Sequence, residues 1–465
     1  MAGKWPYKRV EEIALKIAMG PFGSSIKVET FTDSGIPIIS GQHLREAQVT
    51  DGEFNFITEA HADSLKNANV QRGDVIFTHA GNIGQVAFIP DDSAYQRYVI
   101  SQRQFYLRCN TDLMLPEFIT YYFKTPEGQH RLLANANQVG VPSIARPSSY
   151  LKTIEVPVPS IEEQQVAVRN IKALDAKIRL NIGINQTLEA MAQALFQSWF
   201  VDFDPVKAKI AAKAESRDPL RAAMTAISGK PDAELDTLPP EALKQLAATA
   251  ALFPDEMEAS ELGEIPKGWA FQSAETLADV GIGKTPPRKE PQWFTEGEGD
   301  WRWVSIKDMR ASGVFQQRSS EFLTADAVSR FNVRVVPDRT VLLSFKLTIG
   351  RVAITDGPMV TNEAIAHFKL PCNPAISSEY LYLYLKSFDY STLGSTSSIA
   401  DAVNSKTIRE MPIAVASRDL IDRFTKSVAP LFEEIRNRQN EIASLVSTRD
   451  ALLPKLLSGE IEVPV

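Results

Sequence analysis

Short hydrophobic runs separated by polar loops fill the first 155 residues of the chain. Four runs rich in β-branched and aromatic residues cover positions 36–40, 74–77, 85–89 and 103–107. Such runs between turn residues are typical of short strands, and Gly81-Asn82 between two of them predicts a turn. Pro116 and Glu117 suit the first turn of a helix that extends to Lys124. The pattern therefore predicts a mixed α/β module.

A helical pattern follows Pro159. Residues 161–200 contain no proline, and they predict one helix of roughly 60 Å at 1.5 Å per residue, although Asn181 interrupts its hydrophobic face. A second helical pattern near the end of the chain follows heptad spacing, with Arg438 and Arg449 at its two polar steps. We expect the hydrophobic seams of the two helices to comprise Ile171, Leu174, Ile178, Leu188, Leu195, Leu431, Ile435, Ile442, Leu445 and Leu452.

Two long amphipathic helices in one chain are expected to pack against each other. A helix of this length exceeds what a module of about 150 residues can cover, although packing of each helix on its own module is the alternative. Each helix follows a globular module. Antiparallel packing would therefore place the modules at opposite ends of the pair, and parallel packing would place them side by side.

The whole pattern occurs twice. The stretch 72–89 recurs as 338–354, and 117–124 recurs as 379–386, within an offset of 254 to 266 residues. Solenoid repeats have periods of about 20–50 residues, so this offset indicates a duplicated unit of module plus helix. We expect five segments: a first module at 1–158, its helix at 159–203, a connector at 204–262, a second module at 263–414, and a second helix with the tail at 415–465. Two similar modules suit a bipartite, roughly two-fold-related ligand.

Composition and charge set limits on the partner. Hydrophobic residues make up 44% of the chain, which is ordinary for a globular protein, and no apolar run approaches the 18 or so residues of a membrane helix. With only two cysteines and no signal peptide pattern at the start, we expect a cytoplasmic protein without a membrane partner. The net charge is −7, but residues 231–264 hold nine acidic residues and one basic residue, which leaves 49 basic and 48 acidic residues elsewhere. Bulk charge therefore neither requires nor excludes DNA.

Catalytic motifs are not found. Gly283-Lys284-Thr285 resembles a phosphate loop, but Ala278 stands where the motif needs glycine, and Pro286 follows. The Gly-x-Ser-x-Gly motif is missing, as are Asn-Pro-Pro-Tyr and the paired His or Cys spacings of a metal site. We therefore expect a chain that is not an enzyme and that binds neither metal nor cofactor.

Polar loops occupy the same places in both modules but carry different residues. Arg and Lys suit guanine edges or phosphates, whereas Gln and Asn suit adenine edges. The candidate DNA-binding residues are Ser24, Ser25, Lys27, Gln42, His43, Arg45, His79, Asn82, Gln102, Arg103, Gln104, Lys284, Thr285, Arg288, Lys289, Lys307, Lys346, Thr348 and Asn362. Any single one of them could be an ordinary solvated loop residue. The repetition of polar slots with changed residues is what two modules that recognise different sequences would show.

Five further stretches resemble a known family. They are Gly20-Pro21-Phe22-Gly23-Ser24-Ser25, Val156-Pro157-Val158-Pro159, Phe200-Val201-Asp202-Phe203-Asp204-Pro205, Glu261-Leu262-Gly263-Glu264-Ile265-Pro266 and Leu452-Leu453-Pro454-Lys455-Leu456-Leu457. In this order they resemble the specificity (S) subunit of bacterial type I restriction-modification systems over essentially the whole chain. Ala414-Val415-Ala416-Ser417 departs from the Pro-x-x-Glu-Gln form at the second junction, which leaves the start of the second helix open.

The resemblance implies an α+β protein with two target-recognition domains, duplicated with pseudo-two-fold symmetry and separated by a long antiparallel two-helix coiled coil. It implies a subunit that binds an asymmetric bipartite site on double-stranded DNA and directs adenine methylation and ATP-dependent cleavage by its partners. Those partners would be two methyltransferase subunits and, in the nuclease form, two restriction subunits, which would carry S-adenosylmethionine, ATP and Mg. The alternatives are a coiled-coil scaffold whose modules bind proteins and a self-sufficient methyltransferase or nuclease.

Overall fold

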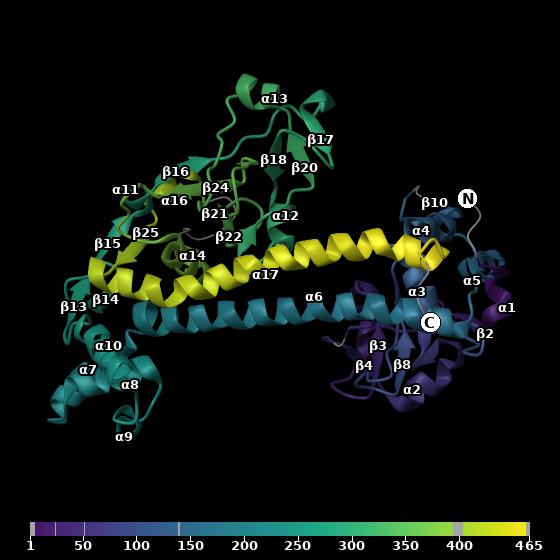
Figure 1. The fold of residues 1–465 in the computed structure, drawn as a ribbon, viewed down its shortest axis with the longest axis horizontal. Coiled ribbons are helices and arrows are strands. Elements are labelled where there is room, and N and C mark those ends of the chain that lie inside the picture. Colours follow the sequence, from purple (N-terminus) through teal and green to yellow (C-terminus); the bar gives the residue numbers. More distant parts are fainter. Residues whose placement is uncertain (1–4, 24, 51, 138–139, 394–402, 462–465) are drawn as a thin grey trace. The chain divides into compact units, whose positions relative to one another are not determined.

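The computed structural model describes residues 5–23, 25–50, 52–137, 140–393 and 403–461. It divides into two compact units, of which the first holds residues 1–179 and 443–465 and the second holds residues 180–442. Helices α6 (Ile161–Phe196) and α17 (Arg418–Ser458) contribute to both units (Figure 1). None of the helices in the described ranges is long and apolar enough to cross a membrane.

The first unit contains two four-stranded sheets. One has the strand order β2-β9-β6-β7 and is antiparallel, and the other has the order β4-β3-β8-β5 with β3 and β8 parallel. The strands are β1 (Tyr7–Arg9), β2 (Ala14–Met19), β3 (Ile36–Ile39), β4 (Asn55–Ile57), β5 (Asn69–Gln71), β6 (Asp74–Thr78), β7 (Val86–Phe88), β8 (Arg97–Ile100), β9 (Gln104–Cys109), β10 (Ala136–Asn137), β11 (Ser143–Ile144) and β12 (Glu155–Pro157). The helices that accompany them are α1 (Val10–Ile13), α2 (Glu59–Ser64), α3 (Pro116–Lys124), α4 (Pro126–Leu133) and α5 (Pro147–Thr153).

The second unit repeats this order with additions. Its larger sheets have the orders β16-β24-β21-β22-β19 and β17-β20-β18-β23, and β18 and β23 are again parallel. The strands are β13 (Met257–Ser260), β14 (Gly263–Pro266), β15 (Ala270–Ser273), β16 (Asp279–Ile282), β17 (Phe294–Glu296), β18 (Trp301–Val304), β19 (Phe315–Gln316), β20 (Glu321–Leu323), β21 (Val341–Ser344), β22 (Val352–Thr355), β23 (Val360–Thr361), β24 (Ile365–Lys369) and β25 (Pro412–Val415). The helices of its module are α11 (Ala274–Leu277), α12 (Ile306–Ala311), α13 (Ala325–Arg330), α14 (Ser378–Ser387) and α16 (Ser405–Glu410).

The central strand of each unit is buried on both faces. In β6, Val75 and Phe77 belong to the core under the helices, whereas Ile76 belongs to the core between the two sheets. Strand β21 has the same alternation, with Val341 in one core and Leu342 in the other. Successive side chains of a strand point to opposite faces, so a strand covered on both faces is a continuous hydrophobic run. This explains why these segments were recognisable from sequence, and the predicted mixed α/β fold is confirmed.

The two long helices pair antiparallel, as predicted. Within the second unit, Asn181 of α6 contacts Arg438 and Glu441 of α17, while Phe196, further along α6, meets Phe424 at 5.8 Å between ring centroids. The partner numbers fall along α17 as the residue numbers rise along α6. In the first unit, Ile171 of α6 lies in the same hydrophobic cluster as Leu453, Leu456 and Leu457 of α17.

The helix ends differ from the sequence-based expectation in detail. Helix α6 passes at residue 197 into a π-helical turn, Gln197–Val201, and Phe203 then takes a left-handed conformation with φ of 57°. Helix α17 begins at Arg418, because β25 extends to Val415 and the backbone carbonyl of Ser417 accepts a hydrogen bond from the N–H of Ile421 at 3.1 Å. Gly459 ends α17 with φ of 75°, as expected of a left-handed C-terminal cap.

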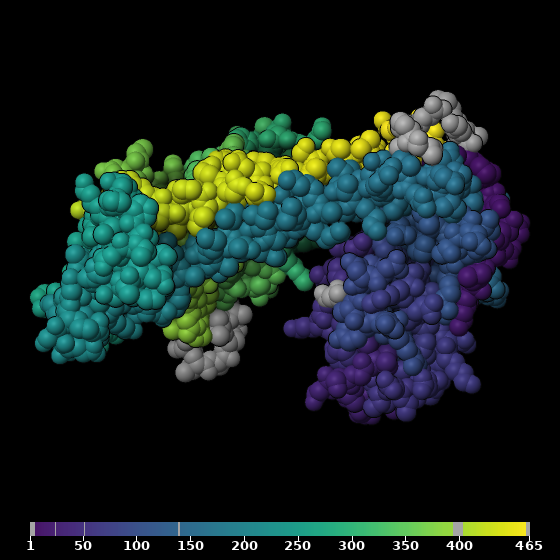
Figure 2. Space-filling model, turned by 60° about the horizontal axis from the view of Figure 1, so that its bottom comes forward, coloured from purple at the N-terminus to yellow at the C-terminus, as the bar shows by residue number. Residues whose placement is uncertain are grey.

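The connector between the two copies is helical. It comprises α7 (Asp204–Ala214), α8 (Pro219–Ser228), α9 (Asp232–Leu235) and α10 (Pro240–Ala251), which enclose a small core of their own. The side chain of Arg423 on α17 donates to Thr249 Oγ1 at 2.7 Å and to the Gln245 carbonyl at 2.9 Å. Figure 2 shows this connector, in teal, against the first turns of α17, in yellow.

Candidate nucleic-acid interface

Four of the candidate loops of the first unit lie together at one end of the sheet β2-β9-β6-β7. Six backbone hydrogen bonds of 2.9–3.3 Å hold these loops together. The pairs, each written from N–H donor to carbonyl acceptor, are Gly20 to Gln104, Thr78 to Gln85, His79 to Arg103, Gly84 to Thr78, Ser101 to Ile39, and Gln104 to Ser101. Gly20 is required here, because a Cβ at this position would lie 2.2 Å from the Ser101 carbonyl oxygen. Loops after β2, β3, β6 and β8 are thereby fixed beside one another.

The second unit contains the same frame. Six backbone hydrogen bonds of 2.9–3.3 Å again hold its loops together. From N–H donor to carbonyl acceptor they are Gly283 to Ile365, Ser344 to Arg351, Phe345 to Ala364, Gly350 to Ser344, Asn362 to Val304, and Ile365 to Asn362. Gly283 again permits close approach, since its Cβ would lie 2.2 Å from the Asn362 carbonyl oxygen. The two bond sets define equivalent positions: His79 matches Phe345, Gly81 matches Leu347, Arg103 matches Ala364, and Gln104 matches Ile365.

Several polar side chains on the first frame are exposed. Lys27, Arg45, Asn82, Gln102 and Arg103 are all exposed, and among the described residues none forms an ion pair with Arg103. Its guanidinium lies over Gly81, where a Cβ would come within 3.2 Å of Arg103 Nη1. Lys27 and Arg45 provide further exposed cations, and such side chains suit phosphates or guanine edges.

Three weaker candidates also lie in these loops. Gln102 Nε2 donates to the Ile26 carbonyl at 3.3 Å, so this side chain is partly engaged. Ser25 Oγ donates to the Phe22 carbonyl at 2.7 Å, and Gln42 Nε2 donates to the Glu53 carbonyl at 3.2 Å; both residues remain exposed. Ser24 lies outside the described residues.

The structure corrects the predicted DNA contacts of His43 and Gln104. His43 is 3% exposed and its ring stacks on Phe54 at 4.4 Å. Its Nδ1 accepts the Ser40 N–H at 3.0 Å, and Asp308 does the same for the Ser305 N–H at 2.9 Å in the second unit. His43 is therefore a capping residue, and burial lowers its pKa.

Gln104 is buried beside Ser101 at the start of β9. It therefore has no access to a base edge. His79 is half-buried, and its Nε2 lies 3.1 Å from the Gln102 carbonyl oxygen. Burial lowers the pKa of His79, which favours the neutral ring. His79 therefore helps to position the loop at 101–104.

The second frame presents mainly lysines. Lys284, Lys289, Lys307 and Lys346 are exposed; Lys284, Lys289 and Lys346 lie in loops, and Lys307 lies in the first turn of α12. Such compact cations bind phosphate as point charges. The amide oxygen of Asn362 accepts the Ala364 N–H at 3.1 Å.

Carboxylates engage two other candidates in the second frame. Arg288 forms a bidentate pair with Glu321 at 2.6 and 2.9 Å. Its guanidinium carbon also lies 4.2 Å from the ring centroid of Phe294 and 4.4 Å from that of Trp303. Hydrogen bonding to Glu321 raises the pKa of Arg288. Thr285 Oγ1 donates to Glu363, so Arg288 and Thr285 are less available than the lysines.

Three residues of the second frame were missed by sequence reasoning. Arg351 Nη1 donates to the Ile306 carbonyl at 2.6 Å and supports the first turn of α12, which carries Lys307. Glu363 presents an exposed carboxylate, which can accept from cytosine N4. Leu347 is 90% exposed at the tip of the loop after β21, although Thr348 beside it is partly buried. A residue-by-residue alignment of the two copies would have placed Arg351 opposite Gln85 and Leu347 opposite Gly81.

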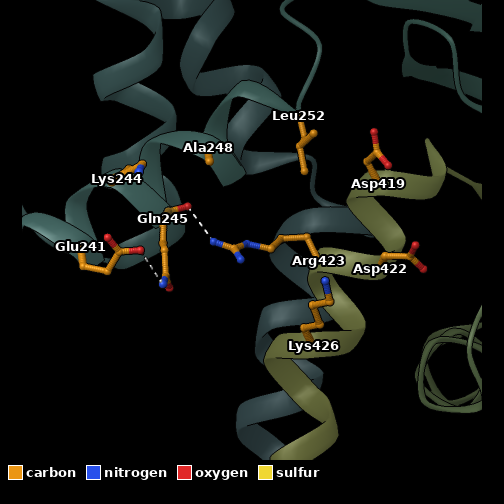
Figure 3. A pocket seen from close by; sticks show the side chains of 9 residues that line it. All are labelled: Glu241, Lys244, Gln245, Ala248, Leu252, Asp419, Asp422, Arg423 and Lys426. Carbon is orange, nitrogen blue, oxygen red and sulfur yellow. Dashed lines mark hydrogen bonds between the residues drawn. The ribbon is translucent and has the colours of Figure 1, made fainter.

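A polar pocket of about 400 Å³ lies elsewhere, between α10 and the start of α17 (Figure 3). Its lining includes three carboxylates and three cations: Glu241, Asp419, Asp422, Lys244, Arg423 and Lys426. These charges balance one another, and Arg423 is already bonded to α10. Nothing in this lining favours one class of ligand.

Within the described ranges, no group of three or more His, Cys, Asp or Glu side chains is placed to hold a metal ion. The two frames instead offer arginine, lysine and amide groups on rigid loops. This chemistry suits recognition of a polyanion whose edges carry hydrogen-bonding groups.

Comparison with known proteins gives consistent similarities. Residues 4–190 and 266–418 match the family model described as the type I restriction modification DNA specificity domain. The chain is 32% identical over 418 residues to the type I restriction enzyme HindI specificity subunit of Haemophilus influenzae, with 84% of this chain and 87% of that protein covered. It is 24% identical over 478 residues to the type I restriction enzyme MjaIX specificity subunit of Methanocaldococcus jannaschii, with 99% and 94% covered. The crystal structure of the type I restriction-modification system S subunit from M. genitalium shares the fold, with a TM-score of 0.50 at 15% identity over 99% of this chain and 97% of that one.

Proposed function

We propose that this chain, which belongs to the type I restriction-modification DNA specificity family, is a DNA sequence-recognition subunit whose two loop frames each recognise one half of a bipartite site. The observation that carries the proposal is the repetition of six backbone hydrogen bonds in each unit with different side chains mounted on them. A fixed frame holds recognition groups in place, and changed side chains change which base edges are complementary. Two related frames with different side chains would recognise an asymmetric sequence.

The chain supplies binding and no chemistry in this proposal. Adenine methylation and ATP-dependent cleavage would be carried out by partner subunits, two for methylation and two for restriction. S-adenosylmethionine, ATP and Mg would be bound by those partners. The paired helices α6 and α17 would provide the surface on which two copies of one partner dock, because the duplication gives two similar surfaces.

The proposal is tested by mapping methylated adenines in cells that carry the gene and in cells from which it is deleted. Loss of methylation at one bipartite motif, restored by the gene, is the expected result. The purified complex with the methyltransferase subunit should then bind that motif with an affinity that falls as salt rises, because released counterions drive phosphate binding. An unchanged methylation pattern after deletion would contradict the proposal.

The net charge of −7 favours a second candidate, a coiled-coil scaffold that binds only proteins. In that case the complex would bind DNA weakly or not at all, and any affinity would be independent of salt. The excess of acidic over basic residues lies in residues 231–264, which hold nine acidic residues and one basic residue. Two of these acids, Asp232 and Asp236, pair with Arg221 of the connector. The loop frames are free of this excess, which makes DNA recognition the better-supported function.

A further inference from the structure

Among the described residues, Leu347 is the most exposed large hydrophobic side chain, with 90% of its surface accessible. It lies at the tip of the loop between β21 and β22, with the exposed cation Lys346 before it and Thr348 after it. An isolated exposed leucine usually has no meaning. This one stands on the loop frame of the second unit, between groups suited to DNA.

The leucine is held in place against its local preference. Leu347 has a φ of 61°, a left-handed conformation that glycine adopts easily and that costs free energy for a residue with a Cβ. Ser344 fixes the loop around it: Ser344 Oγ donates to the Thr348 carbonyl at 2.7 Å and accepts the Arg351 N–H at 3.1 Å. The adjacent Phe345 is buried and anchors the loop.

The first unit has different residues at the position that corresponds to Leu347. The equivalent residue is Gly81, over which the Arg103 guanidinium lies, and the residue equivalent to Arg103 is Ala364. One frame therefore presents an arginine above a glycine, and the other presents a leucine with an alanine at the arginine's position. The two substitutions, Gly81 to Leu347 and Arg103 to Ala364, affect the same part of the frame. This part of the frame therefore carries one long side chain in each unit, Arg103 in the first and Leu347 in the second.

We propose that Leu347 is a specificity-determining residue that contacts the C5-methyl group of a thymine in the second half-site. The proposal rests on the proposed DNA-recognition function. In the major groove only thymine presents a methyl group, and apolar side chains recognise it by contact. An arginine at the corresponding place in the first unit suits guanine instead, so the two half-sites would differ in base type at corresponding positions. Lys346 would hold the loop to the neighbouring phosphate.

The test removes the two partners of this contact separately. Binding of the intact complex with the methyltransferase subunit is measured on the cognate duplex and on duplexes in which each thymine of the second half-site is replaced by deoxyuridine. One replacement should weaken binding by the wild-type chain about fourfold, the equivalent of burying one methyl group at about 0.8 kcal/mol. The L347A complex should bind the cognate duplex more weakly and should be insensitive to that same replacement.

The control is L262A, which truncates another exposed leucine of the second unit, at the turn between β13 and β14 and outside the loop frame. It should keep the wild-type sensitivity to deoxyuridine. A second half-site without thymine, an L347A complex that keeps the fourfold sensitivity, or one that loses affinity equally on every duplex would overturn the inference. If the wild-type complex fails to distinguish the cognate from a scrambled duplex, the proposed function itself is wrong, which is a separate result.

Discussion

The guanidinium of Arg103 lies over Gly81, which has no side chain. A Cβ at Gly81 would stand 3.2 Å from Arg103 Nη1. The guanidinium is exposed and, among the described residues, forms no ion pair, so its fork of donors is available to a guanine edge. We therefore expect R103A to lose about 1–3 kcal/mol of binding free energy at one G·C pair of the first half-site. Competition binding with single-base-pair variants of the cognate duplex would measure this.

The control for R103A is R9A, which removes another exposed arginine of the first unit at a position outside the loop frame. It should leave the preference at that base pair unchanged. Equal weakening by R103A on every duplex, with a salt slope smaller by about one, would mean that Arg103 contacts a phosphate.

Arg288 shows why the sequence alone could not identify which arginine is available. Arg103 and Arg288 both lie in polar loops of the sequence. Glu321, which is 33 residues from Arg288 in sequence, accepts hydrogen bonds from both terminal nitrogens of Arg288. The choice between an available guanidinium and an engaged one depends on strand pairing between β18 and β20, which places Glu321. Burial of His43 likewise depends on packing, since the ring of Phe54, immediately before β4, stacks on it.

His367 makes a prediction about acid stability. It is 2% exposed, its Nε2 contacts Thr361 Oγ1 at 2.6 Å, and burial lowers its pKa from 6.5 to about 3. Below pH 6.5 the unfolded chain binds a proton that the folded chain excludes, so stability is complete above pH 6.5 and falls as the pH decreases toward 3. At pH 5 the loss is about 2 kcal/mol, from 1.36 kcal/mol per pKa unit.

The variant H367Y tests this, because Tyr106 occupies the equivalent place in the first unit. Its unfolding free energy should decrease by about 2 kcal/mol less than that of the wild type between pH 7 and pH 5. Urea unfolding at the two pH values measures the difference. H130Q, at an exposed histidine, should follow the wild type, and parallel pH profiles for H367Y and the wild type would refute the assignment.

Polar layers interrupt the hydrophobic seam between the two long helices. In the first unit, Asp175 of α6 accepts hydrogen bonds from Arg449 of α17 at 3.0 Å and from Tyr121 of α3 at 2.7 Å. Burial and the neighbouring Asp175 raise the pKa of Tyr121, so the phenol remains a donor. In the second unit, Asn181 bonds to Arg438 and Glu441. Polar residues at such positions are known to fix register in coiled coils.

We expect D175A to destabilise the first unit by about 1–3 kcal/mol, because it removes the acceptor of the Tyr121 hydroxyl and of Arg449 Nη1. Arg449 keeps Asp450 as a second partner, which accepts from its Nε at 3.0 Å and from its Nη2 at 2.8 Å. The side chains of Asp175 and Arg449 are 11% and 23% exposed. The double variant D175L/R449L, which replaces both charges with apolar groups, should recover only the part of the loss that comes from Arg449, because the Tyr121 hydroxyl still lacks its acceptor. The midpoint of urea unfolding measures both. Equal destabilisation by the single and double variants would show that the lost bond between Asp175 and Arg449 contributes nothing, and that Tyr121 and packing account for the loss.

Most helices and strands could be predicted from the sequence. The polar contacts between α6 and α17 could not, because each depends on a residue of the other helix. Buried strands such as β6 and the helix α3 follow local patterns that do not depend on partners. Asn181, by contrast, interrupts a predicted seam, and its role depends on which residue of α17 faces it. An antiparallel register is a long-range property that neither helix specifies alone. The polar positions of one helix find their explanation only in those of the other.

The duplication of the whole chain leads to a prediction about modularity. Each loop frame closes within its own unit through backbone hydrogen bonds, and its anchoring glycines, Gly20 and Gly283, contact carbonyls of the same unit. Recognition by one frame therefore does not require side chains of the other. We expect the two half-sites to be exchangeable independently.

Replacing residues 1–155 by the equivalent domain of another member of the family should change one half of the methylated motif and leave the other half intact. The replaced segment contains all of β1 but only Glu155 of its partner strand β12, so Val156 and Pro157 of the original chain must pair with the incoming β1. Sequencing of methylated adenines in cells that carry the chimera would measure the outcome. The reciprocal exchange at residues 263–414 should change only the other half. A motif that changes in both halves would mean that the two frames depend on each other, and a motif that changes in neither would place recognition outside the loops.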